Sequence, residues 1–119
     1  FQLRDDVLGV FGDPEITGKP AGDDLREGKR TVLIAYALSS GSAAVRKEIT
    51  EQLGRPDLDE DAVASLRSAI QESGALATTE ALIAEHTEQA FSTLAALAVD
   101  EQTRSALESL AHAAVTRTA

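Results

Sequence analysis

The stretch FQLRDDVLGVFGDPEITGKPAGDDLREGKRT, residues 1–31, is the most informative part of this chain. Its opening part, to about residue 12, carries apolar residues at helical spacing, which predicts a helix with one buried stripe. The residues of that stripe are Leu3, Val7, Val10 and Phe11. Glycines and prolines then crowd residues 12–22, where we expect no regular structure. Acidic and basic residues are interspersed throughout, so the stretch combines a buried helix face with a cluster of charges.

Helix signals recur along the rest of the chain, and no segment alternates with the period of a strand. Asp24, with Glu27 three residues later, has the pattern of a capping box and predicts a second helix that ends near residue 38. Further helices are expected at about 43–53, 60–73, 75–97 and 101–116, the second of them capped by Asp59. Their expected inward residues are Val63, Leu66, Ile70, Leu76, Leu82, Ile83, Phe91, Leu94, Leu97, Leu107, Leu110, Ala111 and Ala114. We therefore predict an all-α fold, an antiparallel helical bundle in a single domain over residues 1–119.

The composition narrows the classes of partner and chemistry. The formal net charge is −9, and acidic surfaces repel nucleic acid and anionic lipid, so we expect neither nucleic-acid binding nor direct membrane insertion. The chain has no cysteine, which excludes disulfides, thiolate catalysis and cysteine-based zinc sites. No apolar run approaches the ~20 residues that span a bilayer, and no signal-peptide pattern opens the chain, so we expect a cytoplasmic protein.

One face of the first predicted helix is suited to a divalent cation. At 100° per residue, Gln2, Asp5, Asp6 and Gly9 share one arc of about 100°. Two adjacent carboxylates repel each other unless a cation lies nearby. Mg²⁺ takes one or two carboxylates and completes its octahedron with water and phosphate oxygens. The pair therefore has the character of half a site that a phosphorylated ligand would complete.

Two lysines offer the positive charge that a phosphorylated ligand needs. Lys19 lies between Gly18 and Pro20, and Lys29 follows the second acidic pair. Lysine is a compact cation suited to phosphate oxygens, and Asp24 could hold a metal-bound water. The residues alone leave a second interpretation open, in which the acids form a solvated helix face, and the P-loop pattern G-x-x-x-x-G-K-[ST] is absent.

In its order and spacing, the stretch resembles the second aspartate-rich region of the trans-isoprenyl diphosphate synthases, or polyprenyl synthetases. The matching motifs are F-Q-x-x-D-D at 1–6, F-G-D at 11–13, T-G-K at 17–19 and G-x-D-L-x-x-x-K-x-T at 22–31. The amino-acid sequence of this stretch is most similar to those of bacterial geranylgeranyl diphosphate synthases. The resemblance implies the C-terminal part of an isoprenoid-synthase-type fold, with the second motif at 1–13 and the diphosphate-binding loop and helix start at 17–31.

The resemblance also implies an activity. Such enzymes, usually homodimers, join an allylic diphosphate to isopentenyl diphosphate head to tail and release pyrophosphate. Three Mg²⁺ ions bridge two aspartate-rich motifs to the allylic diphosphate. Carried over to this sequence, the resemblance implies that Asp5 binds metal, with support from Asp6 and Gln2. Lys19 and Lys29 would contact the departing diphosphate, and Asp24 would hold a metal-bound water. Phe1 would form part of the cavity wall, and Gln2 would face the substrate. The catalytic candidates are thus Asp5, Asp6, Lys19 and Lys29.

Two departures from the family pattern shape the remaining expectations. Many relatives carry an aspartate where this chain has Gly9, which removes one potential outer carboxylate. The first aspartate-rich motif does not occur in these residues, and the chain has no methionine even at position 1. We therefore expect a C-terminal portion of a longer synthase that has no prenyl-transfer activity by itself. The alternative is a non-catalytic helical regulatory or small-subunit relative that acts through dimer contacts.

Overall fold

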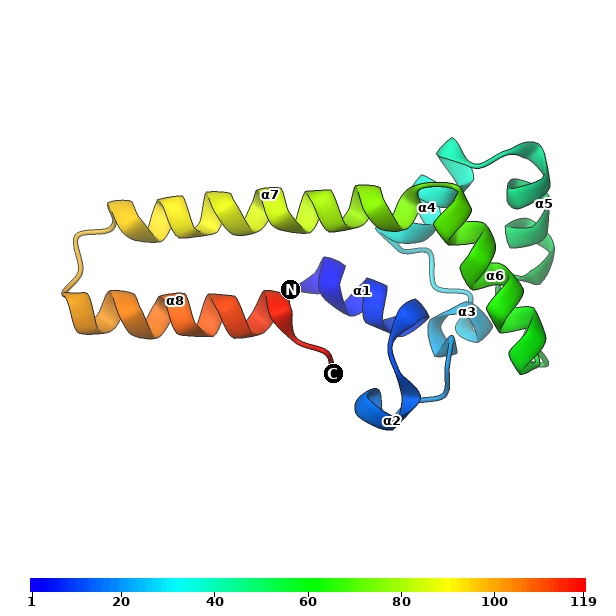
Figure 1. Ribbon diagram of the computed structural model, residues 1–119, viewed down its shortest axis with the longest axis horizontal. Helices are drawn as coiled ribbons and strands as arrows, with labels where there is room; N and C mark the ends of the chain where they lie inside the picture. Colours follow the sequence, from blue (N-terminus) through cyan, green and yellow to red (C-terminus); the bar gives the residue numbers. More distant parts are fainter.

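The computed structural model describes residues 1–119, and its regular structure is entirely helical (Figure 1). The helices in chain order are α1 (Gln2–Phe11), α2 (Pro14–Thr17), α3 (Asp23–Glu27), α4 (Val32–Ser40), α5 (Ala43–Gln52), α6 (Glu60–Glu72), α7 (Ala75–Ala96) and α8 (Glu101–Thr116). The prediction of an all-α fold is confirmed. None of the helices combines the length and the apolar character that crossing a membrane would require.

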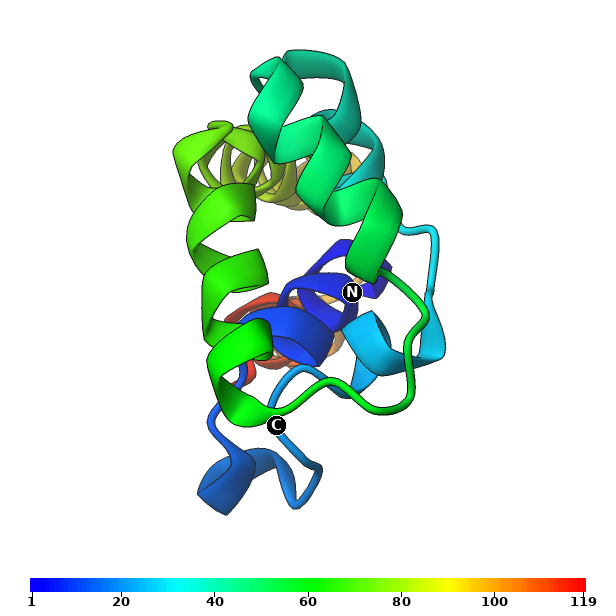
Figure 2. The ribbon, with the colours of Figure 1, turned by 90° about the vertical axis from the view of Figure 1, so that its right-hand side faces the viewer.

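Helices α7 and α8 form a long antiparallel hairpin that projects from the rest of the molecule (Figure 1). The first part of α7 packs against α4 and α6, and α8 returns along α7 until it ends beside α1. Figure 2 views the opposite end, where α5 and α6 pack on each other and face the viewer. The molecule is elongated, with extents of 52 × 30 × 17 Å. The N- and C-termini of the chain both lie near α1 (Figure 1).

The hydrophobic core lies where α4, α5, α6 and the start of α7 converge, with one side closed by α1 and α3. Its largest fully buried apolar residues are Val10, Leu25, Leu33, Ile34, Ile49, Val63, Leu66 and Ile70. The prediction that Val63, Leu66 and Ile70 form the inner face of α6 is confirmed. The predicted cap is confirmed as well, because the Asp59 carboxylate accepts the backbone N–H of Ala62 at 2.8 Å.

The single second helix expected from Asp24 to about residue 38 is wrong, because the chain breaks there into α3 and α4. Gly28 ends α3 with φ 72°, and Thr31 begins α4 by accepting the N–H of Ile34 at 3.3 Å. Residue 28 must be a glycine, because its φ is left-handed and a Cβ there would lie 2.8 Å from the Cα of Gly54. The expected capping box is also wrong, since Gly22 occupies the N-cap of α3 and the Asp24 side chain makes no cap hydrogen bond.

Two further expectations need correction. Residues 12–22 contain one helical turn, α2, because Asp13 caps it by accepting the N–H of Glu15 at 2.9 Å. Helix α8 has no buried residue, although it was expected to carry an inward face. Leu110 is 68 % exposed and Leu107 37 %, because α8 packs mainly on α7 and its apolar stripe has no other cover within this chain.

The position of the core predicts the effect of truncating two chemically identical side chains. Leu66→Ala should lower the free energy of unfolding by about 2–5 kcal/mol, because Leu66 is fully buried and its removal leaves a cavity. Leu110→Ala is the matched control and should change stability by less than about 0.5 kcal/mol, since its side chain is mostly exposed. Urea denaturation followed by circular dichroism measures both, and equal losses would contradict the placement of the core.

Candidate functional site

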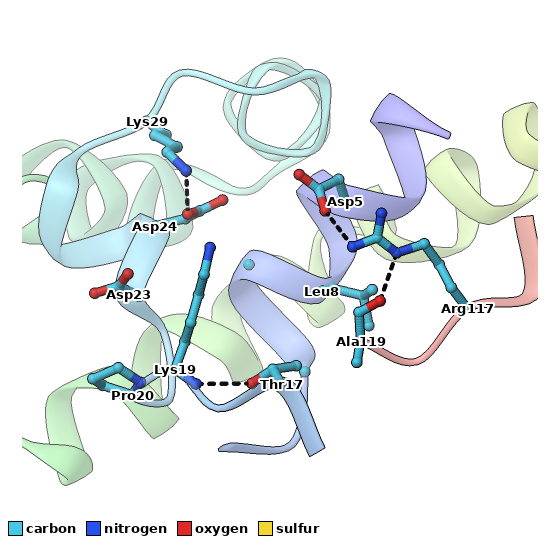
Figure 3. Close-up of a pocket in the computed structure, with 12 residues that line it drawn as sticks. Asp5, Leu8, Thr17, Lys19, Pro20, Asp23, Asp24, Lys29, Arg117 and Ala119 are labelled. Atoms are coloured by element: carbon cyan, nitrogen blue, oxygen red, sulfur yellow. Dashed lines mark hydrogen bonds and ion pairs between the residues drawn. The ribbon is translucent and has the colours of Figure 1, made fainter. Parts of the chain in front are cut away.

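A pocket of about 120 Å³ opens between α1, the α2–α3 segment and the C-terminal residues (Figure 3). It is the place where the charged residues of the opening stretch converge. Its charged lining residues are Asp5, Lys19, Asp23, Asp24, Lys29 and Arg117. Three carboxylates and three basic side chains, drawn from separate segments, therefore share one concave surface.

Asp24 reaches this surface because α1 carries a glycine at position 9. A Cβ built on Gly9 would overlap the carboxylate of Asp24, so any larger residue at position 9 would displace that side chain. Asp24 is only 6 % exposed and belongs to α3, yet its carboxylate lies against the polar face of α1. The space that an outer carboxylate of α1 would fill is thus filled by a carboxylate from another helix.

Lys29 holds the buried carboxylate in place. Its Nζ donates to Asp24 Oδ1 at 2.6 Å (Figure 3). A carboxylate oxygen of Glu27 lies 3.5 Å from the same Nζ. The hydrogen bond to Asp24 raises the pKa of the Lys29 ammonium above its ordinary value, and the charge of Asp24 adds to that effect. The Lys29 side chain remains half-exposed, so a charged ammonium is fixed at the wall of the pocket.

Asp6 lies beside this cluster but is not among the residues that line the pocket. Burial is the main cause that raises the pKa of the Asp6 carboxyl, and the nearby charges of Asp24 and Asp5 raise it further. Lys29 and the backbone N–H of Val32 act in the opposite direction. The negative charge of its neighbours therefore makes the surroundings of Asp6, beside the pocket, favourable for a cation.

Asp5 lines the pocket from α1 and makes an ion pair with the C-terminal segment. Its Oδ1 lies 3.1 Å from Nη2 of Arg117, whose guanidinium carbon is 4.8 Å from the centre of the Phe1 ring. Phe1 is 67 % exposed and Gln2 is exposed, and neither lines the pocket within this chain. Sequence reasoning missed Arg117, because nothing in its local pattern distinguishes it from any other charged residue near a helix end.

Lys19 is the other basic residue predicted from sequence to contact a phosphate. It follows Gly18, which has φ 69°, and its backbone N–H donates to Thr17 Oγ1 at 3.4 Å. Its side chain extends into the pocket and makes no ion pair (Figure 3). The Lys19 ammonium is therefore available to an anion, whereas the Lys29 ammonium is shared with Asp24.

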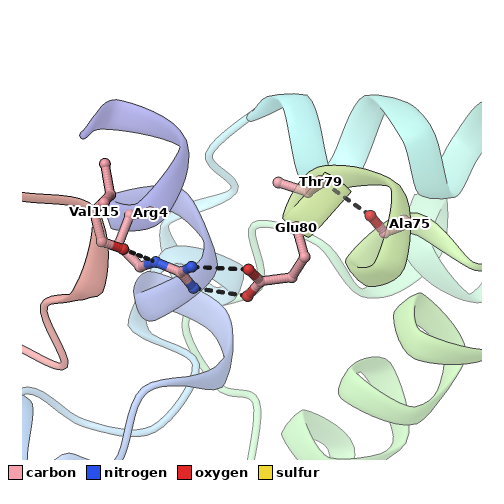
Figure 4. Close-up of polar contacts among 5 residues, drawn as sticks. All are labelled: Arg4, Ala75, Thr79, Glu80 and Val115. Atoms are coloured by element: carbon pink, nitrogen blue, oxygen red, sulfur yellow. Dashed lines mark hydrogen bonds and ion pairs between the residues drawn. The ribbon is translucent and has the colours of Figure 1, made fainter. Parts of the chain in front are cut away.

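Helix α1 is fixed to the hairpin through Arg4, the neighbour of Asp5 (Figure 4). The Arg4 guanidinium donates to both carboxylate oxygens of Glu80 on α7, at 2.7 and 2.8 Å. Its Nε donates to the backbone carbonyl of Val115 near the end of α8, at 2.9 Å. One side chain thus joins α1, α7 and α8, and it sets where the last residues of the chain lie relative to Asp5.

The donor set of the pocket fits a divalent cation that is shared with a phosphorylated ligand. No group of three or more histidine, aspartate or glutamate side chains in the chain is placed to hold a metal ion by itself. Mg²⁺ does not need three, because water and phosphate oxygens normally complete its coordination. Asp5 and Asp23 contribute carboxylates to the same pocket that Lys19 and Lys29 line, so metal and phosphate would be held side by side.

Comparison with known proteins gives a consistent result. Residues 1–70 match the family model of the polyprenyl synthetases. The chain is 42 % identical over 111 residues to a geranylfarnesyl diphosphate synthase of Aeropyrum pernix, covering 92 % of this chain and 34 % of the relative. It is 32 % identical over 122 residues to a (2E,6E)-farnesyl diphosphate synthase of Mycobacterium tuberculosis, covering all of this chain and 34 % of that enzyme.

Solved structures give the same picture. The geranylgeranyl pyrophosphate synthase of Corynebacterium glutamicum, complexed with isoprenyl diphosphate and magnesium, superposes with a TM-score of 0.91 and 41 % identity over 98 % of this chain and 33 % of its own. The second structure is a polyprenyl synthase of Caulobacter crescentus complexed with calcium and isoprenyl diphosphate. It superposes with a TM-score of 0.81 and 37 % sequence identity, covering 99 % of this chain and 36 % of its own. The chain spans about a third of the length of these relatives.

The contact between Gly9 and Asp24 predicts an unusual response to alanine. In an open helix Gly→Ala stabilises by about 1 kcal/mol, but Gly9→Ala should instead destabilise the chain by about 1–3 kcal/mol, because the new methyl group meets a buried carboxylate. Thermal melting followed by circular dichroism measures the change. The control is a double-mutant cycle with Asp24→Ala, in which the penalty of Gly9→Ala should disappear. A Gly9→Ala variant that melts at or above the wild-type temperature would contradict the contact.

Proposed function

The chain belongs to the polyprenyl synthetase family, and we propose that it forms the diphosphate-binding half of a prenyl diphosphate synthase site. The proposed activity of the whole protein is head-to-tail condensation of an allylic diphosphate with isopentenyl diphosphate, with release of pyrophosphate. The observation that carries the proposal is the pocket in which Asp5, Lys19 and Lys29 converge. The solvated-face interpretation of these charges does not account for a buried Asp24 fixed by a lysine.

The charged residues singled out from the sequence each have a defined part in this proposal. When the allylic carbon–oxygen bond breaks, its electron pair stays on the departing diphosphate, so cations that contact the phosphate oxygens stabilise the leaving group. Lys19 supplies an unpaired ammonium for this purpose, and Lys29 supplies one that Asp24 keeps oriented. Asp5 would hold the divalent cation with support from Asp6, which lies beside the pocket, and Asp24 would hold a water bound to the cation. When bound, the cation neutralises charge on the diphosphate.

The finer features of the family belong to the same proposal. Three Mg²⁺ ions, a homodimeric assembly and a cytoplasmic location are predictions for the whole protein. The magnesium and isoprenyl diphosphate of the Corynebacterium glutamicum complex support the choice of metal and ligand. Phe1 and Gln2, at the start of α1, are proposed to face the prenyl chain. In this chain Phe1 is mostly exposed, beyond the residues that line the pocket.

The first test is ligand-dependent thermal stability. Pyrophosphate together with Mg²⁺ should raise the melting temperature by several degrees, because a ligand at 100 times its Kd stabilises the folded state by about 2.7 kcal/mol. Lys19→Ala should reduce that rise by at least half. Lys47→Ala is the matched control, since Lys47 lies on α5 and pairs only weakly with Glu51 at 3.9 Å. Equal reductions in the two variants would exclude a specific role for Lys19.

The second test concerns turnover. In the proposed reaction two aspartate-rich motifs hold the cations that neutralise the allylic diphosphate, and this chain contains one of the two. We therefore expect no prenyl transfer when the chain is incubated alone with geranyl diphosphate, isopentenyl diphosphate and Mg²⁺. Product analysis by mass spectrometry measures this, and clear chain elongation by the isolated chain would refute the expectation.

A further inference from the structure

Arg117 is the third basic side chain of the pocket, and neither the sequence motifs nor the proposed function gives it a role. It comes from the C-terminal segment, far in sequence from the acidic and lysine residues that it accompanies. Figure 3 shows it on the opposite side of the pocket from Lys19 and Lys29. A ligand between them would therefore meet positive charge from two directions.

Arg117 is held in its position by contacts on several sides. Arg4 fixes the position of the end of α8. Its Nε donates to the backbone carbonyl of Val115, two residues before Arg117 (Figure 4). The guanidinium then lies over the Phe1 ring, with 4.8 Å from its carbon to the ring centre. Such stacking restrains a planar cation without using any of its N–H donors. The side chain is 28 % exposed, so it is restrained yet open to the pocket.

The hydrogen bonds of Arg117 leave part of its donor set free. Nη2 pairs with Asp5 Oδ1 at 3.1 Å, and Nε donates to the backbone oxygen of Ala119 at 2.7 Å. Nη1 makes no hydrogen bond within the chain. A guanidinium has five N–H donors in a rigid plane, so it can keep a carboxylate on one side and bind phosphate oxygens with the rest.

We propose that Arg117 is a further diphosphate-contacting residue, which binds the anion from the side opposite Lys19 and Lys29 while Asp5 and the Phe1 ring orient it. The proposal rests on the proposed function, because it assigns a residue to the same site. It names a diphosphate anion as the ligand, either free pyrophosphate or the diphosphate end of a prenyl substrate. Because Arg117 would contact only the diphosphate, it should contribute equally to the affinity for free pyrophosphate and for a prenyl diphosphate.

The test is isothermal titration calorimetry of the 119-residue chain at a fixed, saturating Mg²⁺ concentration, with pyrophosphate and isopentenyl diphosphate titrated separately. Arg117→Gln should weaken both ligands roughly tenfold, the loss of about one charge-assisted hydrogen bond. Arg117→Lys should recover part of the affinity, because it restores the charge but not the planar fork. Arg55→Gln is the matched control, since it makes the same charge change at an exposed residue away from the pocket. Circular dichroism checks that each variant is folded at the titration temperature.

The outcomes separate this proposal from the function on which it rests. If the wild-type chain binds neither ligand with Mg²⁺, the proposed function fails and Arg117 loses its assignment with it. If the wild-type chain binds but Arg117→Gln matches Arg55→Gln, the role of Arg117 is overturned and the proposed function stands. A variant that loses affinity for Mg²⁺ alone, with diphosphate affinity unchanged once Mg²⁺ is saturating, would also overturn it, because Arg117 would then act only by holding Asp5.

Discussion

The ion pair between the buried Asp24 and the half-exposed Lys29 is the interaction on which the N-terminal part of the structure depends. A carboxylate that is only 6 % exposed needs a partner, because an unpaired buried charge is strongly destabilising. Lys29 supplies that partner at 2.6 Å, and Gly9 leaves the space that the carboxylate occupies. One side chain thus requires α1, α3 and the turn after α3 to keep a single arrangement.

The same arrangement determines the electrostatics of the pocket. With Asp24 against α1, the carboxylates of Asp5 and Asp6 lie near a third negative charge, and burial adds to the cost of ionising Asp6. Lys29 offsets part of this charge, while Lys19 remains without a counter-ion. The pocket therefore offers carboxylates to a cation and an ammonium to an anion, a combination suited to a metal–phosphate ligand rather than to either ion alone.

Local signals in the sequence were sufficient for the elements that depend on local interactions. The Asp59 cap and the glycine before residue 75 predicted the bounds of α6 and α7 to within a residue or two. The aspartate-rich motif singled out Asp5, Lys19 and Lys29, which line one pocket. The close approach of Gly28 to Gly54 could not be predicted, because the two residues are far apart in the sequence. Periodicity likewise identified the apolar stripe of α8 but not what covers it.

Arg117 illustrates why the rest of the site needs the structure. At 1.5 Å per residue, Glu80 lies about 24 Å before the end of α7, and Val115 about 21 Å after the start of α8. The two are therefore level across the hairpin, which is why Arg4 can bond to both. The lengths of two helices, neither of which carries a motif, thus fix the end of α8 beside α1. A change of one residue in either helix would rotate that end by about 100°, and Arg117 would no longer face Asp5.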